Sequence, residues 1–304
     1  MNKRDFLTML LASAFFPTRT SAKSAVNNRD AQAFVLSLSY SEHPNLALGN
    51  TANDGRLMST IFRKLGFGSV EHLSDTDGEK FAAAFDRFAD RIAPSTKAFV
   101  YLAGHGIQIA GSNYLLLGDG KTYVELRSII ETIRQKAQIL VLMVDACRNN
   151  PYLDAGNSAG EGRSVRALSF SSDDDSGGND HDRARKAGFS FRQLGLAEEK
   201  ASRIGAFSIR GTGVKVIFST DPANVAADWI YPEDENSPFA KSVAARIMEK
   251  RSLDDVMSMV TGDVVKVSAG KQSPWSQGSV GVPIFLAGPP ENRNPAKTPF
   301  LVPG

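Results

Sequence analysis

Ile139-Leu140-Val141-Leu142-Met143-Val144-Asp145-Ala146-Cys147-Arg148 is the stretch that decides the fold, because an unbroken apolar run leads directly into a polar end. A second run of this kind, Ala98-Phe99-Val100-Tyr101-Leu102, leads into Ala103-Gly104-His105-Gly106. Near-continuous apolar runs are typical of central strands in a parallel sheet that is covered on both faces. The two runs therefore predict neighbouring interior strands, each followed by one reactive side chain, His105 or Cys147.

Apolar runs and amphipathic segments alternate along most of the chain. Strands are expected at 33–39, 69–73, 98–102, 139–144 and 214–219, and helices at 57–65, 81–92, 124–136, 239–250 and 253–267. A hairpin is expected around Gly111-Ser112-Asn113, and a last apolar run covers 280–286. This order predicts a three-layer α/β fold, with a mainly parallel sheet between helices on both faces. In such sheets the chemistry gathers at the carboxyl ends of the strands, where His105 and Cys147 lie.

Composition favours one large globular domain and excludes several classes of partner. The chain has 304 residues, of which 42% are hydrophobic and 22% are charged. Its formal net charge of +2, from 35 basic and 33 acidic residues, provides no strong field for nucleic acid or a charged membrane surface. Its single cysteine excludes an internal disulfide.

The N-terminus predicts export. Lys3 and Arg4 precede an apolar run over 6–16, and small residues follow near Ser21-Ala22. This is the layout of a secretory signal over residues 1–22, and it resembles the twin-arginine type. The run is too short to span a bilayer, so no membrane span is expected after signal removal, and the protein would reach the periplasm or the exterior. A frayed helix of a cytoplasmic protein is the alternative.

Cys147 and His105 are the candidate catalytic residues. A thiol is a strong nucleophile only as its thiolate, so it needs a neighbouring base, and His105 is the natural candidate. Glycines flank His105 and leave room for a bound chain, and the backbone N–H groups of Gly106 and Cys147 are candidate oxyanion donors. A small buried hydrophobic cysteine and a structural histidine are the alternatives.

Asp145 and Asp54 are candidate binding residues. In an extended strand the side chain of Asp145 points to the same face as that of Cys147. A carboxylate beside a thiol disfavours the thiolate, so Asp145 needs another use, such as binding a cationic side chain. A loop-capping aspartate is the alternative for Asp145. Asp54 is a candidate second acid of the same pocket, although Asn53 or Asp54 also lies where a helix cap is expected.

Residues 153–209 interrupt the alternation of strands and helices. They include Ser171–Gly178 and the charged run Asp180–Lys186, with little apolar periodicity. A loop of this length inside one domain, here residues 31–288, is usually functional or disordered. Asp173-Asp174-Asp175 lacks the spacing of a calcium loop, and one cysteine with four dispersed histidines lacks that of a zinc site. No metal site or cofactor is predicted, and a Pro-rich tail covers 289–304.

Five motifs resemble those of the bacterial caspase-like peptidases. These enzymes belong to the caspase/metacaspase family and are of the orthocaspase type. The resemblance extends over residues 31–287. Its motifs are Ala103-Gly104-His105-Gly106, Asp145-Ala146-Cys147-Arg148, Asn53-Asp54, Ser219-Thr220 and Asn236-Ser237-Pro238-Phe239. The first two are specific and the others are supportive. The resemblance implies a three-layer caspase-hemoglobinase fold, and many relatives have serine where this chain has Ala103.

The resemblance also implies a function. Cys147 would attack the scissile carbonyl and His105 would act as base and then as acid, with a thioester intermediate. Asp54 and Asp145 match acids that bind Arg or Lys, and Ser219 belongs to a matching substrate-binding segment. The expected partners are therefore protein or peptide substrates with basic residues. Caspases that cut after Asp carry Gln in the place of Asp145, which disfavours that specificity here.

The resemblance also raises self-cleavage and calcium activation. Members of the family often cut their own chain in the loop after the catalytic cysteine, and calcium activates many metacaspases. The corresponding basic residues, which also fit a merely solvated loop, are Arg163, Arg166, Arg183, Arg185 and Lys186. Two other functions are a catalytically silent caspase-fold module that acts by protein binding or signalling, and a cysteine hydrolase of non-peptide amides or esters. The sequence also leaves the oligomeric state open.

Overall fold

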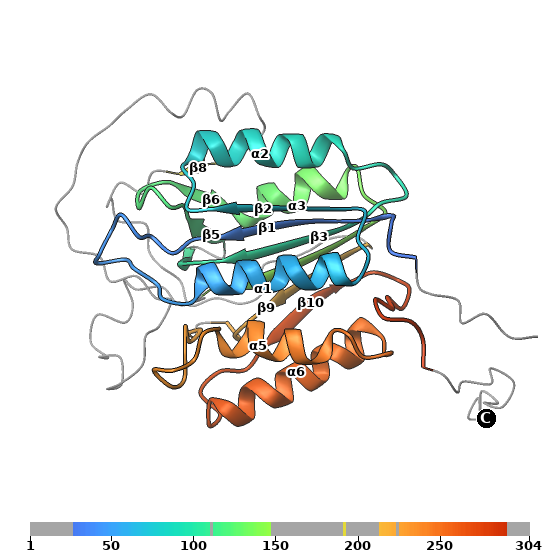
Figure 1. Ribbon diagram of the computed structural model, residues 1–304. Coiled ribbons are helices and arrows are strands. Elements are labelled where there is room, and N and C mark those ends of the chain that lie inside the picture. The colour runs from blue at the N-terminus through green and yellow to red at the C-terminus, as the bar shows by residue number, and fades with distance from the viewer. Residues whose placement is uncertain (1–26, 110–111, 147–190, 193–212, 223–224, 291–304) are drawn as a thin grey trace, which may run out of the picture.

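A central sheet of six strands lies between two layers of helices (Figure 1). The computed structural model describes residues 27–109, 112–146, 191–192, 213–222 and 225–290. The strands of the central sheet, in its order, are β10 (Trp275–Ser279), β9 (Val214–Phe218), β7 (Ile139–Asp145), β3 (Lys97–Ala103), β1 (Ala31–Ser37) and β2 (Ser69–Ser74). The helices are α1 (Thr51–Lys64), α2 (Gly78–Asp90), α3 (Leu126–Arg134), α5 (Pro238–Arg246) and α6 (Leu253–Val267).

The central sheet is parallel except at one edge. β1 pairs in parallel with β2 and β3, and β7 pairs in parallel with β3 and β9, whereas β10 runs antiparallel to β9. The three-layer α/β fold with a mainly parallel sheet is therefore confirmed. Because the parallel strands run the same way, their carboxyl ends meet at one edge of the sheet.

The helices cover both faces of this sheet, with α2 and α3 on one face and α1, α5 and α6 on the other (Figure 1). Alternate residues of β1 reach the two layers. Phe34 packs against Phe81, Phe85 and Phe88 of α2, at ring centroid distances of 6.2, 5.3 and 5.4 Å. Val35 belongs to the other core, which includes residues of α1, α5 and α6. These apolar faces hold the strand ends in place.

A second, antiparallel sheet follows His105. Its strands, in order, are β4 (Gly106–Ile109), β5 (Ser112–Leu116), β6 (Tyr123–Glu125) and β8 (Phe191–Arg192). The pairing of β4 with β5 confirms the predicted hairpin. The helix expected over 124–136 begins later, at Leu126, because Tyr123–Glu125 pairs with β5 and so forms a strand.

The start of α1 differs from the expected one. The helix begins at Thr51 with Asn50 as its N-cap, so Asp54 lies inside the first turn and neither Asn53 nor Asp54 is the cap. Asn50 makes no side-chain cap bond and instead donates from Nδ2 to the carbonyl oxygens of Asp228 and Asp234, at 3.0 and 2.8 Å. Contacts distant in sequence therefore fix where this helix starts.

Several sequence predictions concern residues outside the described ranges. The signal segment over 1–22 and nearly all of the tail over 289–304 belong to these, as does the loop over 153–209 except for β8. Within the part of the chain that the structure describes, no helix is both long and apolar enough to cross a membrane.

His72 predicts a pH dependence of stability. It is partly buried on β2, with its Nε2 2.8 Å from Ser37 Oγ, and α1 passes so closely that a Cβ on Gly55 would lie 2.5 Å from the imidazole. Burial, followed by the charges of Arg63 and Arg56, lowers the pKa of His72 below its ordinary value of 6.5. His72 therefore binds a proton more readily in the unfolded chain than in the folded one. The contribution of neutral His72 to stability is present above pH 6.5 and is lost as the pH falls.

We expect Tm to fall between about pH 7.5 and about pH 5.5, and His72→Gln to reduce this fall by no more than about 4 °C. The effect is small because solvent reaches much of the ring. Thermal unfolding of the two chains at both values checks it. An identical pH dependence in the variant would show that His72 is not responsible.

Candidate active site

The ends of three parallel strands bring the predicted polar residues to one edge. Ala103, the last residue of β3, pairs in register with Asp145, the last residue of β7. Ser219 follows β9, and its N–H donates to the carbonyl oxygen of Val144 at 2.9 Å. His105 stands two residues beyond Ala103. The register thus places His105, Asp145 and Ser219 together at the carboxyl edge of the sheet.

The imidazole of His105 is held by the loop that follows β1. Its Nε2 lies 2.8 Å from the carbonyl oxygen of Leu46, and its ring packs on that of Tyr40 at a centroid distance of 4.8 Å. A carbonyl oxygen only accepts hydrogen bonds, so Nε2 is the protonated nitrogen. In the neutral ring Nδ1 then carries the lone pair and is the basic nitrogen. His105 is buried, with 4% of its surface exposed.

Tyr40 positions the backbone of His105 as well as its ring. The Tyr40 hydroxyl accepts from the His105 N–H at 2.9 Å and donates to the carbonyl oxygen of Leu116 at 2.8 Å. The backbone between them leaves no space for a side chain, since a Cβ on Gly104 would lie 2.8 Å from the Tyr40 hydroxyl. This contact gives a physical reason for one of the glycines that flank His105.

Tyr40 adopts a left-handed conformation with φ of 55°, which is rare for a bulky residue. The carboxylate of Asp75 stabilises this turn, because its Oδ1 accepts from the N–H groups of Ser39 and Tyr40 at 2.6 and 2.9 Å. A conformation of this kind costs of order 1–3 kcal/mol and persists only where its surroundings impose it. The loop therefore stores strain at the residue that orients His105.

Asp145 is fully buried and accepts hydrogen bonds from two hydroxyls on other elements. Its Oδ2 accepts from Tyr101 on β3 at 3.0 Å and from Ser237, at the start of α5, at 2.6 Å. Neither donor belongs to the loop that follows β7. These contacts give Asp145 partners beyond those of a loop-capping aspartate.

Asp54 is also fully buried, and it contacts the segment at the start of α5 that contains Ser237. Its Oδ1 accepts from Asn236 Nδ2 at 2.9 Å and from the backbone N–H of Ser237 at 3.0 Å. The two acids of the sequence prediction, from α1 and from β7, therefore both contact Ser237. Two carboxylates that share a neighbour form an acidic centre suited to a cationic group.

A family model of the caspase domain matches residues 32–282. The chain belongs to the caspase domain family. The match covers both strands that lead to His105 and Asp145, and the family as a whole is one of cysteine peptidases. A search of curated protein sequences finds no match.

Solved structures support the caspase-like fold. Caspase-1 from Spodoptera frugiperda is 14% identical, with a TM-score of 0.55 over 88% of this chain and 93% of that chain. A protein from Geobacter sulfurreducens is 15% identical, with a TM-score of 0.55 over 86% of this chain and 97% of that chain. Identities this low establish similarity of fold alone.

The structure places most of the predicted site residues of this caspase-domain chain, but not all of them. Gly106 begins β4 directly after His105, and Ser219 is fully buried at the end of β9. Cys147 lies outside the described residues, which reach the buried Ala146 immediately before it. The pairing of Cys147 with His105, and its part in an oxyanion hole, thus stay predictions.

The residues that orient the candidate catalytic and binding side chains through hydrogen bonds were not predicted from the sequence. Leu46 acts through a backbone carbonyl, which leaves no signal in a residue type. Tyr40 and Tyr101 act through hydroxyls that the chain path brings into place. Ser237 was noticed only as part of a supporting motif, and its place before Pro238, a typical first residue of a helix, was the available signal.

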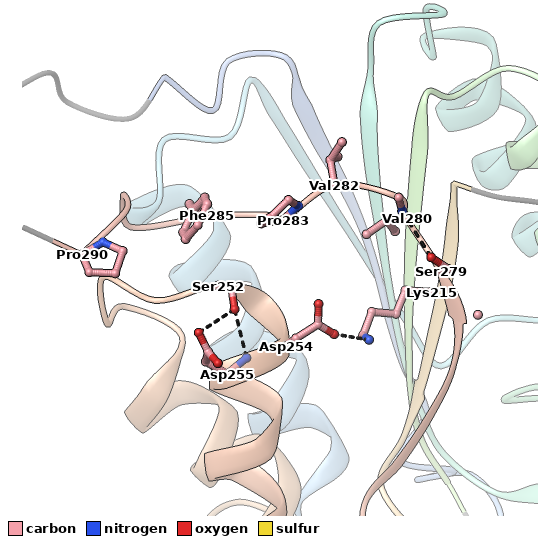
Figure 2. A pocket seen from close by; sticks show the side chains of 12 residues that line it. Lys215, Ser252, Asp254, Asp255, Ser279, Val280, Val282, Pro283, Phe285 and Pro290 are labelled. Atoms are coloured by element: carbon pink, nitrogen blue, oxygen red, sulfur yellow. Dashed lines mark hydrogen bonds and ion pairs between the residues drawn. The ribbon is translucent and has the colours of Figure 1, made fainter. Parts of the chain in front are cut away.

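The pocket in Figure 2, of about 490 Å³, lies elsewhere. Lys215, near the amino end of β9, lines it and forms an ion pair with Asp254 at the start of α6. His105, Asp54 and Asp145 do not line it, so it is separate from the candidate active site. Among the described residues, no three of the His, Cys, Asp and Glu side chains are grouped so as to hold a metal ion.

Proposed function

We propose that the protein is a cysteine endopeptidase that hydrolyses peptide bonds after Arg or Lys. The observation that carries this proposal is the acidic centre of Asp54 and Asp145, joined through Ser237, at the sheet edge that also holds His105. A nucleophile with its base explains the bond cleavage, and the two acids explain the choice of substrate. A silent module would need neither the ordered imidazole nor the acids.

In the proposed reaction His105 Nδ1 takes the proton of the Cys147 thiol, and the sulfur attacks the scissile carbonyl. The N–H groups of Gly106 and Cys147 would stabilise the oxyanion. His105 then protonates the leaving amine, and a thioester remains. Water hydrolyses the thioester, which releases the new carboxylate and restores the thiol. The carbonyl of Leu46 supports these steps because its bond to Nε2 keeps Nδ1 as the basic nitrogen.

The substrate proposal rests on charge. Asp54 and Asp145 would bind the guanidinium of Arg or the ammonium of Lys, with Ser219 lining the same pocket. Both acids are fully buried, so a substrate side chain reaches them only when the groups that cover them move aside. The energy for this opening comes from charge-assisted hydrogen bonds, which are about twice as strong as neutral ones.

We also propose self-processing, calcium activation and export, and each of these needs its own test. Self-cleavage would occur at the basic residues of the loop after Cys147, and mass spectrometry of the active chain tests it. A hydrolase of non-peptide amides or esters is a rival that would keep His105 and Cys147 but would have no use for Asp54 and Asp145.

A direct assay tests the proposed function. The purified chain is incubated with fluorogenic peptides that end in Arg, Lys or Asp, with and without calcium, beside Cys147→Ala. We expect cleavage of the Arg and Lys peptides that depends on Cys147. If no peptide is cut in a Cys147-dependent manner, the peptidase function is wrong, and the silent module becomes the better account.

Tyr40→Phe tests the support of His105. The variant keeps the ring and removes the hydroxyl, so the His105 N–H and the Leu116 carbonyl lose a buried partner, at a cost of roughly 1–3 kcal/mol. We expect kcat to fall about tenfold, the equivalent of about 1.4 kcal/mol, with KM little changed, because the Tyr40 hydroxyl bonds to the backbone of His105 and Leu116.

Steady-state kinetics and thermal unfolding measure both effects. Tyr231→Phe is the matched control, because this tyrosine is 59% exposed and the loss of its hydroxyl leaves no buried group without a partner. An unchanged kcat in Tyr40→Phe would show that the hydroxyl does not position the histidine for catalysis.

A further inference from the structure

Ser237 occupies the junction between the acidic centre and α5. Its side-chain oxygen accepts from the N–H of Ala240 at 3.0 Å, which makes it the N-cap of this helix. Pro238 follows as the first helical residue, and Phe239 is fully buried in the core beneath α5. Ser237 itself has no exposed surface. Its position is therefore fixed by the helix that it starts.

Ser237 contacts both acids with two different donors. Its backbone N–H donates to Asp54 Oδ1 at 3.0 Å, and its hydroxyl donates to Asp145 Oδ2 at 2.6 Å. A hydroxyl has one proton, so donating to Asp145 leaves only its lone pairs for Ala240, and the two roles are compatible. One residue thus sets the placement of two carboxylates that come from separate elements.

The start of α5 also offsets the charge of the two acids. The N-terminus of a helix carries a partial positive charge of roughly half a unit, which favours carboxylates nearby. Asn236 adds a further donor to Asp54, and Tyr101 adds one to Asp145. Two buried carboxylates that contact one residue repel each other, and this set of donors offsets that repulsion.

The segment before Ser237 is anchored to the start of α1, which carries Asp54. Asp228 Oδ2 accepts from the N–H groups of Gly49 and Asn50, at 2.9 and 3.2 Å. Asn53 Nδ2 donates to the carbonyl oxygen of Glu235 at 2.9 Å. The loop from Asp228 to Ser237 is therefore tied to the start of α1 by hydrogen bonds, which help to set the distance from Ser237 to Asp54.

We propose that Ser237 is a positioning residue for substrate specificity, which holds Asp54 and Asp145 so that both face one cationic side chain. This inference rests on the proposed function, because it concerns the same pocket. Ser237 acts through the two acids and takes no part in the covalent steps. Its loss should weaken the binding of a guanidinium and leave the reactivity of Cys147 unchanged.

The test separates positioning from helix capping. Ser237→Ala removes the hydroxyl bond to Asp145 and also the cap of α5, whose loss costs roughly 0.5–2 kcal/mol of stability. Ser237→Thr keeps a hydroxyl for both. Ser252→Ala is the matched control, because Ser252 caps α6 in the same way, accepting from the N–H of Asp255 at 3.2 Å, at the separate pocket of Figure 2.

The probe is Nα-acetylargininamide, and its binding to the Cys147→Ala chain is measured by calorimetry for all three substitutions. We expect Ser237→Ala to weaken binding about tenfold, which corresponds to the loss of a single hydrogen bond to a charged group. We expect Ser237→Thr and Ser252→Ala to change binding less than about threefold. In chains that keep Cys147, the same Ser237→Ala should raise KM for an Arg peptide and leave the rate of alkylation by iodoacetamide unchanged.

Two results would overturn the inference. One is equal binding of the probe by the Ser237→Ala and parent chains. The other is no binding by the parent chain, which would mean that the two acids do not form a cation site. The proposed function is judged separately, since Cys147-dependent cleavage of Arg peptides would still support it in either case.

Discussion

Replacing His105 with alanine is expected to lower kcat/KM for an Arg peptide by about 10²–10⁴-fold, the range contributed by a general acid and base. The residue carries the only base of the proposed mechanism, and its orientation is defined in the structure by Leu46 and Tyr40. Without it, the Cys147 thiol keeps its proton near neutral pH, and the leaving amine has no proton donor.

Two readouts separate this loss from misfolding. Thermal unfolding shows whether the His105→Ala chain is folded, and the pH dependence of iodoacetamide alkylation reports on the thiol. The alkylation of Cys147 should need a higher pH in the variant. Retention of activity within about tenfold of the parent would show that another group acts as the base.

Asp145→Asn is expected to lower kcat/KM for Arg and Lys peptides by about 100-fold. Asparagine has nearly the same shape and still accepts from Tyr101 and Ser237, but it carries no charge. Removing one partner of a buried charge pair costs about 2–5 kcal/mol, which corresponds to roughly 30-fold or more. A peptide that ends in a neutral residue should lose far less.

The comparison between peptides is the decisive readout for Asp145. Asp263→Asn is a suitable control, because this aspartate forms its ion pair with Arg246 on the α5–α6 side of the molecule. An equal loss for basic and neutral peptides would assign Asp145 a structural role and would remove the charge argument for specificity.

The sequence was sufficient to predict five of the six strands of the central sheet, all except β10, and the edge at which the candidate site lies. The apolar runs that became β3 and β7 are long, uninterrupted and followed by polar residues, so strand, burial and direction all follow from one pattern. Helix α6 was predicted at its observed bounds from its helical pattern alone, and the structure adds that Ser252 is its N-cap.

Other features depend on contacts between distant parts of the chain. α1 begins at Thr51 because Asn50 is bonded to Asp228 and Asp234, and no local signal shows this. β10 lies at Trp275–Ser279, before the apolar run that the sequence singled out at 280–286. Its strand is defined by backbone pairing with β9, and its own residues are mostly polar or exposed.

The candidate site likewise contains some residues that the sequence predicted and others that only the structure shows. His105 and Asp145 were named from the sequence because reactive and charged residue types stand out at strand ends, whereas Asp54 and Ser219 depended mainly on the family resemblance. The groups that orient them were not, because a carbonyl oxygen and a strained backbone turn have no residue type of their own. The acids belong to α1 and β7, and only the fold shows that Ser237 joins them.

The most direct test of the central claim is covalent labelling of the intact chain by peptide chloromethyl ketones that end in Arg or in Asp. The sulfur of Cys147 displaces chloride from the reagent, and mass spectrometry of the digested protein locates the adduct. We predict one adduct, on Cys147, formed at least about 100-fold faster with the Arg reagent than with the Asp reagent, and slowed in the Asp145→Asn chain. Equal rates with the two reagents, or an adduct at any other residue, would contradict a caspase-like thiol peptidase directed at basic residues.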